Sequence, residues 1–191
     1  MGSRRLWPRR RCGYAPVRKL ARATPATIAL LRAVNVGGTG KLPMEELRAM
    51  AAALGLANPR TYIASGNLLV DTELPEAKLK ALLETRLAAF VGKPVGVLIR
   101  TATEMAAVAA ANPFAEAPGN RVVAIFLDTA PPPSALTDHK GLADERIALG
   151  RREIFIHYPT SMADSRLAIA AARGGTARNL NTVAKLAALA S

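Results

Sequence analysis

The stretch 31–70 constrains the fold of this chain most, because each apolar segment in it ends in glycine and polar residues. The apolar, partly β-branched segment 27–34 predicts a buried strand that runs into a glycine-rich loop. Pro43 suits the first turn of a helix, and Gly55 suits its end. Binding sites commonly lie beyond strand ends, so this pattern indicates the place of a binding site better than it indicates the activity of the protein.

The segments that follow predict the rest of an α+β unit. Strands are expected at 60–64 and 67–71, joined by a tight Ser-Gly turn. Leucines at helical spacing predict a helix over 75–91, and the apolar segment 95–100 predicts a fourth strand. The order β-α-β-β-α-β is that of the split βαβ, or ferredoxin-like, arrangement.

The second half repeats this order loosely. Its predicted elements are a linking helix at 102–111, a strand at 121–127, a short helical stretch at 135–142, a hairpin of 146–149 with 153–158, and helices at 163–173 and 180–190. No closing strand is visible in this half. The expected fold class is therefore α+β, with two similar ferredoxin-like subdomains at 25–101 and 102–191, which suggests a duplication.

The net charge of +12 is concentrated at the start of the chain. Residues 1–24 carry eight basic residues and no acid, whereas the remainder carries 18 basic and 14 acidic residues. Blocks of like charge are usually solvated tails, so we expect 1–24 to be a basic disordered leader or a start assigned too far upstream. The only cysteine, Cys12, lies in this leader, and a body without cysteine agrees with a cytoplasmic protein. No apolar run approaches the roughly 18 residues that cross a bilayer, so no membrane partner is expected.

The first candidate site cluster follows the first predicted strand and comprises Arg32, Asn35, Gly37, Gly38 and Lys41. Glycines allow a ligand to approach the backbone closely, and backbone amides ahead of a helix favour an anion. The stretch matches neither a Walker A loop nor a dinucleotide fingerprint, so a plain strand-to-helix turn is the competing interpretation.

The second cluster comprises Thr61, Tyr62, Ser65, Gly66 and Asn67. Such residues are also common in hairpins, so a simple turn is again the alternative. In a split βαβ unit the first two strands run parallel with the third between them. The ends of these two strands, and with them the first two clusters, must therefore meet at one end of the sheet.

The third cluster lies in the stretch 174–182, ahead of the last predicted helix. Thr176 or Asn179 could cap that helix. Arg178 and Asn181 would then lie near its positive end, where an anionic ligand is favoured. Capping explains the first two residues without a ligand, but it does not require the arginine.

The usual catalytic motifs are absent from the sequence. His139 and His157 form no metal-ligand spacing, and no zinc-protease motif, nucleophile elbow or carboxylate-rich cluster occurs. Ser65 has no base near it in the sequence, so a nucleophilic role has no support. The sequence therefore assigns no metal, cofactor or reaction, and it leaves open whether the protein is an enzyme.

Six stretches, over about residues 28–186 and in this order, resemble the bacterial domain of unknown function 1697 family: LRAVNVGG, MEELRAMAAALGL, RTYIASGNLLV, ANPF, IFIHYP and GTARNLNTVAKL. The resemblance implies a cytoplasmic α+β protein of two related subdomains, with the leader outside the domain. The family's motifs fall here on Arg32, Asn35, Gly37, Gly38, Thr61, Tyr62, Ser65, Gly66, Asn67, Thr176, Arg178, Asn179, Asn181 and Thr182. The family has no assigned activity, so the resemblance supplies positions rather than a reaction.

The leading hypothesis is a protein that binds a small anionic or polar ligand between the three clusters. Two cations would hold the charge of the ligand and four polar side chains would orient it: Arg32 and Arg178, and Asn35, Ser65, Asn67 and Asn181. One alternative is single-stranded nucleic acid laid across a sheet, although aromatic residues make up only 4% of the chain, which is few for base stacking. Another is a protein-interaction module without catalysis. The sequence does not indicate the oligomeric state.

Overall fold

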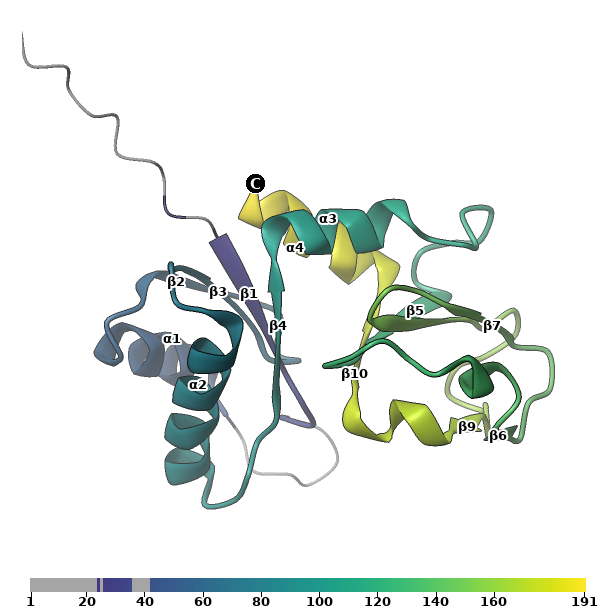
Figure 1. Cartoon of the computed structure of the whole chain (residues 1–191), viewed down its shortest axis with the longest axis horizontal. Helices are drawn as coiled ribbons and strands as arrows, with labels where there is room; N and C mark the ends of the chain where they lie inside the picture. Colours follow the sequence, from purple (N-terminus) through teal and green to yellow (C-terminus); the bar gives the residue numbers. More distant parts are fainter. Residues whose placement is uncertain (1–23, 25, 36–41) are drawn as a thin grey trace, which may run out of the picture.

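The computed structural model describes residues 24, 26–35 and 42–191, and Figure 1 shows the arrangement of its elements. The elements are, in order, β1 (Ala26–Leu31), α1 (Met44–Ala53), β2 (Ala57–Tyr62), β3 (Asn67–Asp71), α2 (Glu76–Val91), β4 (Val97–Thr101), α3 (Ala102–Ala110), β5 (Val122–Phe126), the 3-10 helix η1 (Pro133–Leu136), β6 (His139–Lys140), β7 (Arg146–Leu149), β8 (Glu153–His157), β9 (Ala168–Ile169), the 3-10 helix η2 (Ala170–Gly174), β10 (Thr176–Asn179) and α4 (Leu180–Ala190). The structure is mixed α/β, with two four-stranded antiparallel sheets and one short strand pair.

The first sheet has the strand order expected of a split βαβ unit. Its strands lie in the order β4-β1-β3-β2, and each neighbouring pair is antiparallel. β1 and β2 therefore run parallel with β3 between them. The first strand ends at Leu31, earlier than expected, because Ala33 and Asn35 adopt left-handed backbone that turns the chain away from the sheet.

The second sheet repeats the strand order of the first but not its helices. Its strands lie in the order β10-β5-β8-β7, again antiparallel throughout. The first sheet's crossovers are the α-helices α1 and α2, whereas those of the second carry the short 3-10 helices η1 and η2. The common order agrees with two related halves, but the missing helices leave the expected duplication a prediction.

Three sequence-based expectations for the second half are wrong. The helical stretch expected at 135–142 is instead the 3-10 helix η1 followed by the short strand β6. The helix expected at 163–173 is instead the short strand β9 followed by η2. Ile169, Ala171 and Ala172 pack there on one face of the second sheet, so tertiary packing overrides the helix propensity of the alanines. The closing strand that the sequence did not reveal is β10, which pairs with β5. The helices expected at 102–111 and 180–190 are confirmed as α3 and α4.

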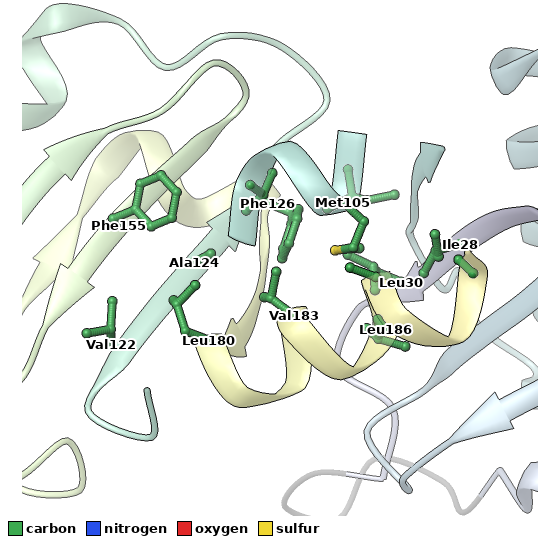
Figure 2. Close-up of a cluster of buried hydrophobic side chains, with 14 of the residues drawn as sticks. Ile28, Leu30, Met105, Val122, Ala124, Phe126, Phe155, Leu180, Val183 and Leu186 are labelled. Carbon is green, nitrogen blue, oxygen red and sulfur yellow. The ribbon is translucent and has the colours of Figure 1, made fainter. Parts of the chain in front are cut away.

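One hydrophobic core joins the two halves. Ala29 and Leu31 face α1 and α2, whereas Ile28 and Leu30 face the opposite way, toward α3 and α4. Figure 2 shows that the side chains of α4 lie between the strands of both sheets. Phe126 of β5 packs among them. The last helix of the chain is therefore part of the core of the first sheet as well as of the second.

Both sheets are covered on both faces within the described residues. The first lies between α1 with α2 on one side and α3 with α4 on the other. The second packs on α3 and α4 with one face and on η1, β9 and η2 with the other. Nucleic acid laid across an open sheet would need a free face, which neither sheet offers in this part of the chain. None of the described helices is both long and apolar enough to cross a bilayer.

Candidate functional site

Two loops meet at the end of the first sheet, as the strand order predicts. The side-chain amide of Asn35 donates to the carbonyl oxygens of Leu42 and Ala64, at 2.9 Å each, and its oxygen accepts from the Leu42 amide at 2.8 Å. One side chain therefore closes the loop after β1 and ties it to the turn between β2 and β3. Gly37, Gly38 and Lys41, which the sequence placed in the same cluster, lie outside the described residues.

The backbone of these two loops adopts conformations that L-residues rarely adopt. Ala33, Asn35 and Ile63 have φ angles of 47°, 57° and 51°. A positive φ is a clear outlier for a β-branched residue, and the Ile63 side chain is also 48% exposed. Gly66 has a φ of 79°, and a Cβ there would lie 2.5 Å from Cγ2 of Val34, so only glycine fits the turn. Hereafter the segments 32–35 and 63–67 are called the loop pair.

Arg178 of β10 reaches into the loop pair from the second half of the chain. Its side chain is buried, and burial lowers its pKa to about 10, so it is charged at neutral pH. Nε donates to Oδ1 of Asn67 at 2.6 Å, Nη1 to Oγ1 of Thr176 at 2.9 Å and the Ala177 carbonyl at 2.7 Å, and Nη2 to the carbonyls of Leu31, Ser65 and Gly66 at 3.1, 2.9 and 3.3 Å. Because the protein uses every N–H group of this guanidinium, Arg178 holds the loop pair in place rather than facing a ligand.

Asn67 is the partner of this arginine in the first half. Its side chain is fully buried, and its amide nitrogen donates to the Tyr62 carbonyl at 2.8 Å and to Oγ of Ser65 at 3.1 Å. The side chain thus fixes both ends of the turn between β2 and β3. Among the residues of the second cluster, Asn67 builds the turn, whereas Thr61 lies on β2 ahead of it and is half-buried.

Two further arginines lie at the loop pair: Arg32 belongs to it, and Arg48 flanks it. Arg32 follows β1 and donates through Nε and Nη2 to the carbonyls of Gly175 and Arg173, at 3.2 and 2.8 Å. Arg48 on α1 is exposed, and its Nη1 donates to Oγ1 of Thr61 at 2.7 Å. Arg48 is not among the site residues predicted from the sequence. The signal that could have found it is its place on the solvent side of a helix that the topology lays beside β2.

The third cluster divides in two. Asn179 caps α4, because its Oδ1 accepts from the Thr182 amide at 2.9 Å. Asn181 is exposed and lies against Gly119, whose carbonyl accepts from the Leu180 amide at 3.0 Å. The structure therefore brings Arg178 to the first two clusters, while the contacts of Asn179 and Asn181 lie at the start of α4.

The loop pair holds polar groups without a catalytic base. Oγ of Ser65 accepts from Asn67, and both histidines lie in the second half, on β6 and β8. His157 packs against Phe114 with the ring centres 5.7 Å apart. Residues 24, 26–35 and 42–191 contain no group of three or more His, Cys, Asp or Glu placed to share a metal ion.

These features define a mixed α/β protein in which two antiparallel sheets share one core and a locked loop pair ends the first. The chain belongs to the family described as "Protein of unknown function (DUF1697)", whose model matches residues 25–155. The family resemblance seen in the sequence is thereby confirmed, although positions 176–182 lie beyond the matched residues.

A solved structure supports the same fold. The chain is similar to the conserved bacterial protein SP0830 from Streptococcus pneumoniae, with 23% sequence identity and a TM-score of 0.67. The similarity covers 87% of this chain and 99% of that one. At this level of identity the likeness concerns the fold alone. No curated protein matches the chain.

Proposed function

We propose that this protein is a cytoplasmic receptor for a small ligand with an anionic or strongly polar group, bound at the loop pair. The observation that carries the proposal is the Asn35 side chain, which locks together two loops that contain three left-handed non-glycine residues. Such strained backbone persists only where the surroundings hold it, and it is typical of ligand sites.

Charge around the loop pair favours an anion. Arg48 is exposed, and its Nη1 donates to Thr61. Its other N–H groups donate to no other residue in the described part of the chain, so they are available to a ligand. A guanidinium can bind a carboxylate or phosphate with two parallel hydrogen bonds. Arg178 stands behind the turn and fixes its carbonyls. In this proposal Arg48 and Arg32 supply charge, and Asn35 and Arg178 supply rigidity.

The proposal is tested by the binding of simple anions to the full chain. Inorganic phosphate, pyrophosphate and citrate are titrated, with thermal unfolding and calorimetry as readouts. A probe at 100 times its dissociation constant stabilises the fold by about 2.7 kcal/mol. We expect Arg48→Ala to weaken binding about tenfold, which is the loss of one charge-assisted contact. Arg48 is exposed, so this change leaves the fold intact.

Arg86→Ala is the matched control, because Arg86 is an exposed arginine on the neighbouring helix α2. It removes the same charge from another surface, and we expect it to leave the affinity unchanged. Equal losses in both variants would reveal a general charge effect and contradict a site at the loop pair. Absence of binding by all three probes would contradict the anionic ligand itself.

A further inference from the structure

A cavity of about 110 Å³ lies between α3 and the β7–β8 hairpin and shares no residue with the loop pair. Helix α3 contributes Ala107, Val108 and Ala111 to its wall. The hairpin contributes Gly150 and Phe155, with Phe155 fully buried beneath the turn. The cavity is therefore a depression between α3 and the hairpin of the second half, with an apolar floor, and Arg100 of β4 also lines it.

Small residues keep this cavity open. Ala107 and Ala111 stand one helical turn apart on the exposed side of α3. Across from them, a Cβ at Gly150 would lie 2.7 Å from Cε2 of Phe155, so a larger residue would displace the ring. An apolar cavity of about 150 Å³ admits benzene. The volume here is smaller, so it suits a short alkyl chain or one edge of a small ring, with the polar end of the ligand at the rim.

The charges around the cavity leave one cation without a partner. Arg100 pairs with Glu153, from Nη2 to Oε1 at 2.9 Å, and Arg152 pairs with Glu104 at 2.8 Å and with Glu76 at 2.9 Å. Arg151 also lines the cavity, is exposed, and has no hydrogen bond or ion pair to any residue of the described ranges. The acids of the wall are thus already paired, and Arg151 is the cation of the lining that an anionic ligand can meet.

We propose that this cavity binds a small carboxylate with an apolar ring or short chain. The apolar part lies against Val108 and Phe155, and the carboxylate pairs with Arg151 at the rim. This site is independent of the loop pair, because the two share no residue and use different arginines. It also gives a ligand direct contact with both α3 and the hairpin.

The test uses three probes of similar size and different charge: benzoate, benzyl alcohol and benzylamine. Their binding to the full chain is measured by ligand-observed NMR. We expect affinity to fall in that order, because only benzoate pairs with Arg151. Arg151→Ala should weaken benzoate about threefold to fivefold, the range of an exposed ion pair, and leave benzyl alcohol unchanged. Arg86→Ala again serves as the arginine control.

Ala107→Leu tests the cavity itself, because the larger side chain fills it while leucine keeps high helix propensity. Ala106→Leu is its matched control, since Ala106 is exposed on the same helix but lies outside the cavity. We expect the first variant to lose all three probes and the second to bind like the wild type. Benzoate binding that survives Ala107→Leu, or the absence of binding at millimolar concentration, overturns the proposal. Equal affinity for the three probes overturns the carboxylate assignment. Arg48→Ala tests the loop pair, so it must leave benzoate binding unchanged if the two sites are independent.

Discussion

Two buried arginines connect the halves of this molecule, and the protein neutralises them in opposite ways. Arg100 of β4 is 1% exposed and reaches Glu153 of β8, which is 3% exposed, with Nε and Nη2 at 3.0 and 2.9 Å from Oε1. Arg178 of β10 is 6% exposed and crosses in the other direction. It meets only carbonyls, one amide oxygen and one hydroxyl among the described residues. One charge is thus balanced by a carboxylate and the other by dipoles.

The difference teaches how each contact depends on its surroundings. A buried ion pair requires both partners, because removing one leaves a bare charge in a medium of low dielectric. A cation held by dipoles requires that several backbone carbonyls keep their positions. For Arg178 these carbonyls belong to the end of β1 and to the turn between β2 and β3. The Arg100 contact therefore supports the interface, whereas the Arg178 contact fixes the geometry of the loop pair.

The largest expected effect is that of Glu153→Ala. It leaves the guanidinium of Arg100 buried without its carboxylate, which costs about 3–5 kcal/mol of unfolding free energy. Urea denaturation measures the loss. Glu116→Ala is the control, because Glu116 pairs with Arg146 at 2.7 Å while 61% exposed. An exposed pair contributes less than about 1 kcal/mol. Similar small losses in the two variants would show that burial does not distinguish these ion pairs.

The next effect is that of Arg178→Met, which keeps bulk but removes every donor. The carbonyls of Leu31 and Ser65 and the amide oxygen of Asn67 lose their partner, and we expect a loss of about 2–4 kcal/mol. Hydrogen exchange should also rise in the turn between β2 and β3, and less elsewhere. Arg173→Met is the control, because Arg173 is exposed on η2. A uniform rise in exchange across both sheets would contradict a local role for Arg178.

Neither contact could be predicted from the sequence, although much of the fold could. The leucines of α2 and the apolar run of β3 are local patterns, so those elements follow from residue spacing. Arg100 lies 53 residues from Glu153, and Arg178 lies 111 residues from Asn67. No local pattern links residues so far apart.

The candidate site could be predicted only in part, because some of its contacts follow from strand order and others depend on how the two halves pack. The meeting of Asn35 with the turn at Ala64 follows from strand order, which the sequence indicates. The strand β10 is only four residues long and contains a charge, so its periodicity is too short to detect. As a result Arg178 was expected at the end of a helix, where a ligand would find it, rather than inside the protein. The buried partners of a charge become visible only once the two halves are packed.

Double variants are expected to change the unfolding free energy less, and they distinguish the two arginine contacts further. Replacing Arg100 by Met together with Glu153 by Leu removes both charges, and an apolar pair of similar volume is often close to neutral in stability. We expect this double variant to unfold within about 1.5 kcal/mol of the wild type and to recover most of the loss of Glu153→Ala. Arg178→Met with Asn67→Leu should recover little, because the carbonyls of Leu31 and Ser65 stay unpaired. Equal recovery in both double variants, measured by urea denaturation, would remove the distinction between the contacts.

Acid pH gives the smallest effect, and it distinguishes the two arginines because carboxylates contact the Arg100 side of the interface, whereas no acid of the described residues contacts Arg178. Burial favours a higher pKa for Glu104, but hydrogen bonds from Thr101 and the charges of Arg152 and Arg100 outweigh it and hold the pKa below its ordinary value of 4.5. A carboxylate whose pKa is lowered in the folded state adds stability above the unfolded pKa, and that stability is lost as the pH falls through the folded pKa.

We therefore expect Glu104→Gln to cost a few tenths of a kcal/mol at neutral pH, as for a partly exposed ion pair. Glutamine keeps the capping of α3, since it can still accept from the Thr101 amide. The difference from the wild type should shrink toward zero as the pH falls through the lowered pKa of the wild-type carboxyl, because that carboxyl is then protonated. The cost of Arg178→Met should stay the same over this range, since no acid contacts that guanidinium among the described residues. Urea denaturation of the wild type, Glu104→Gln and Arg178→Met across this pH range measures both costs. A cost of Arg178→Met that falls with the pH in step with that of Glu104→Gln would show that an acid balances Arg178 after all.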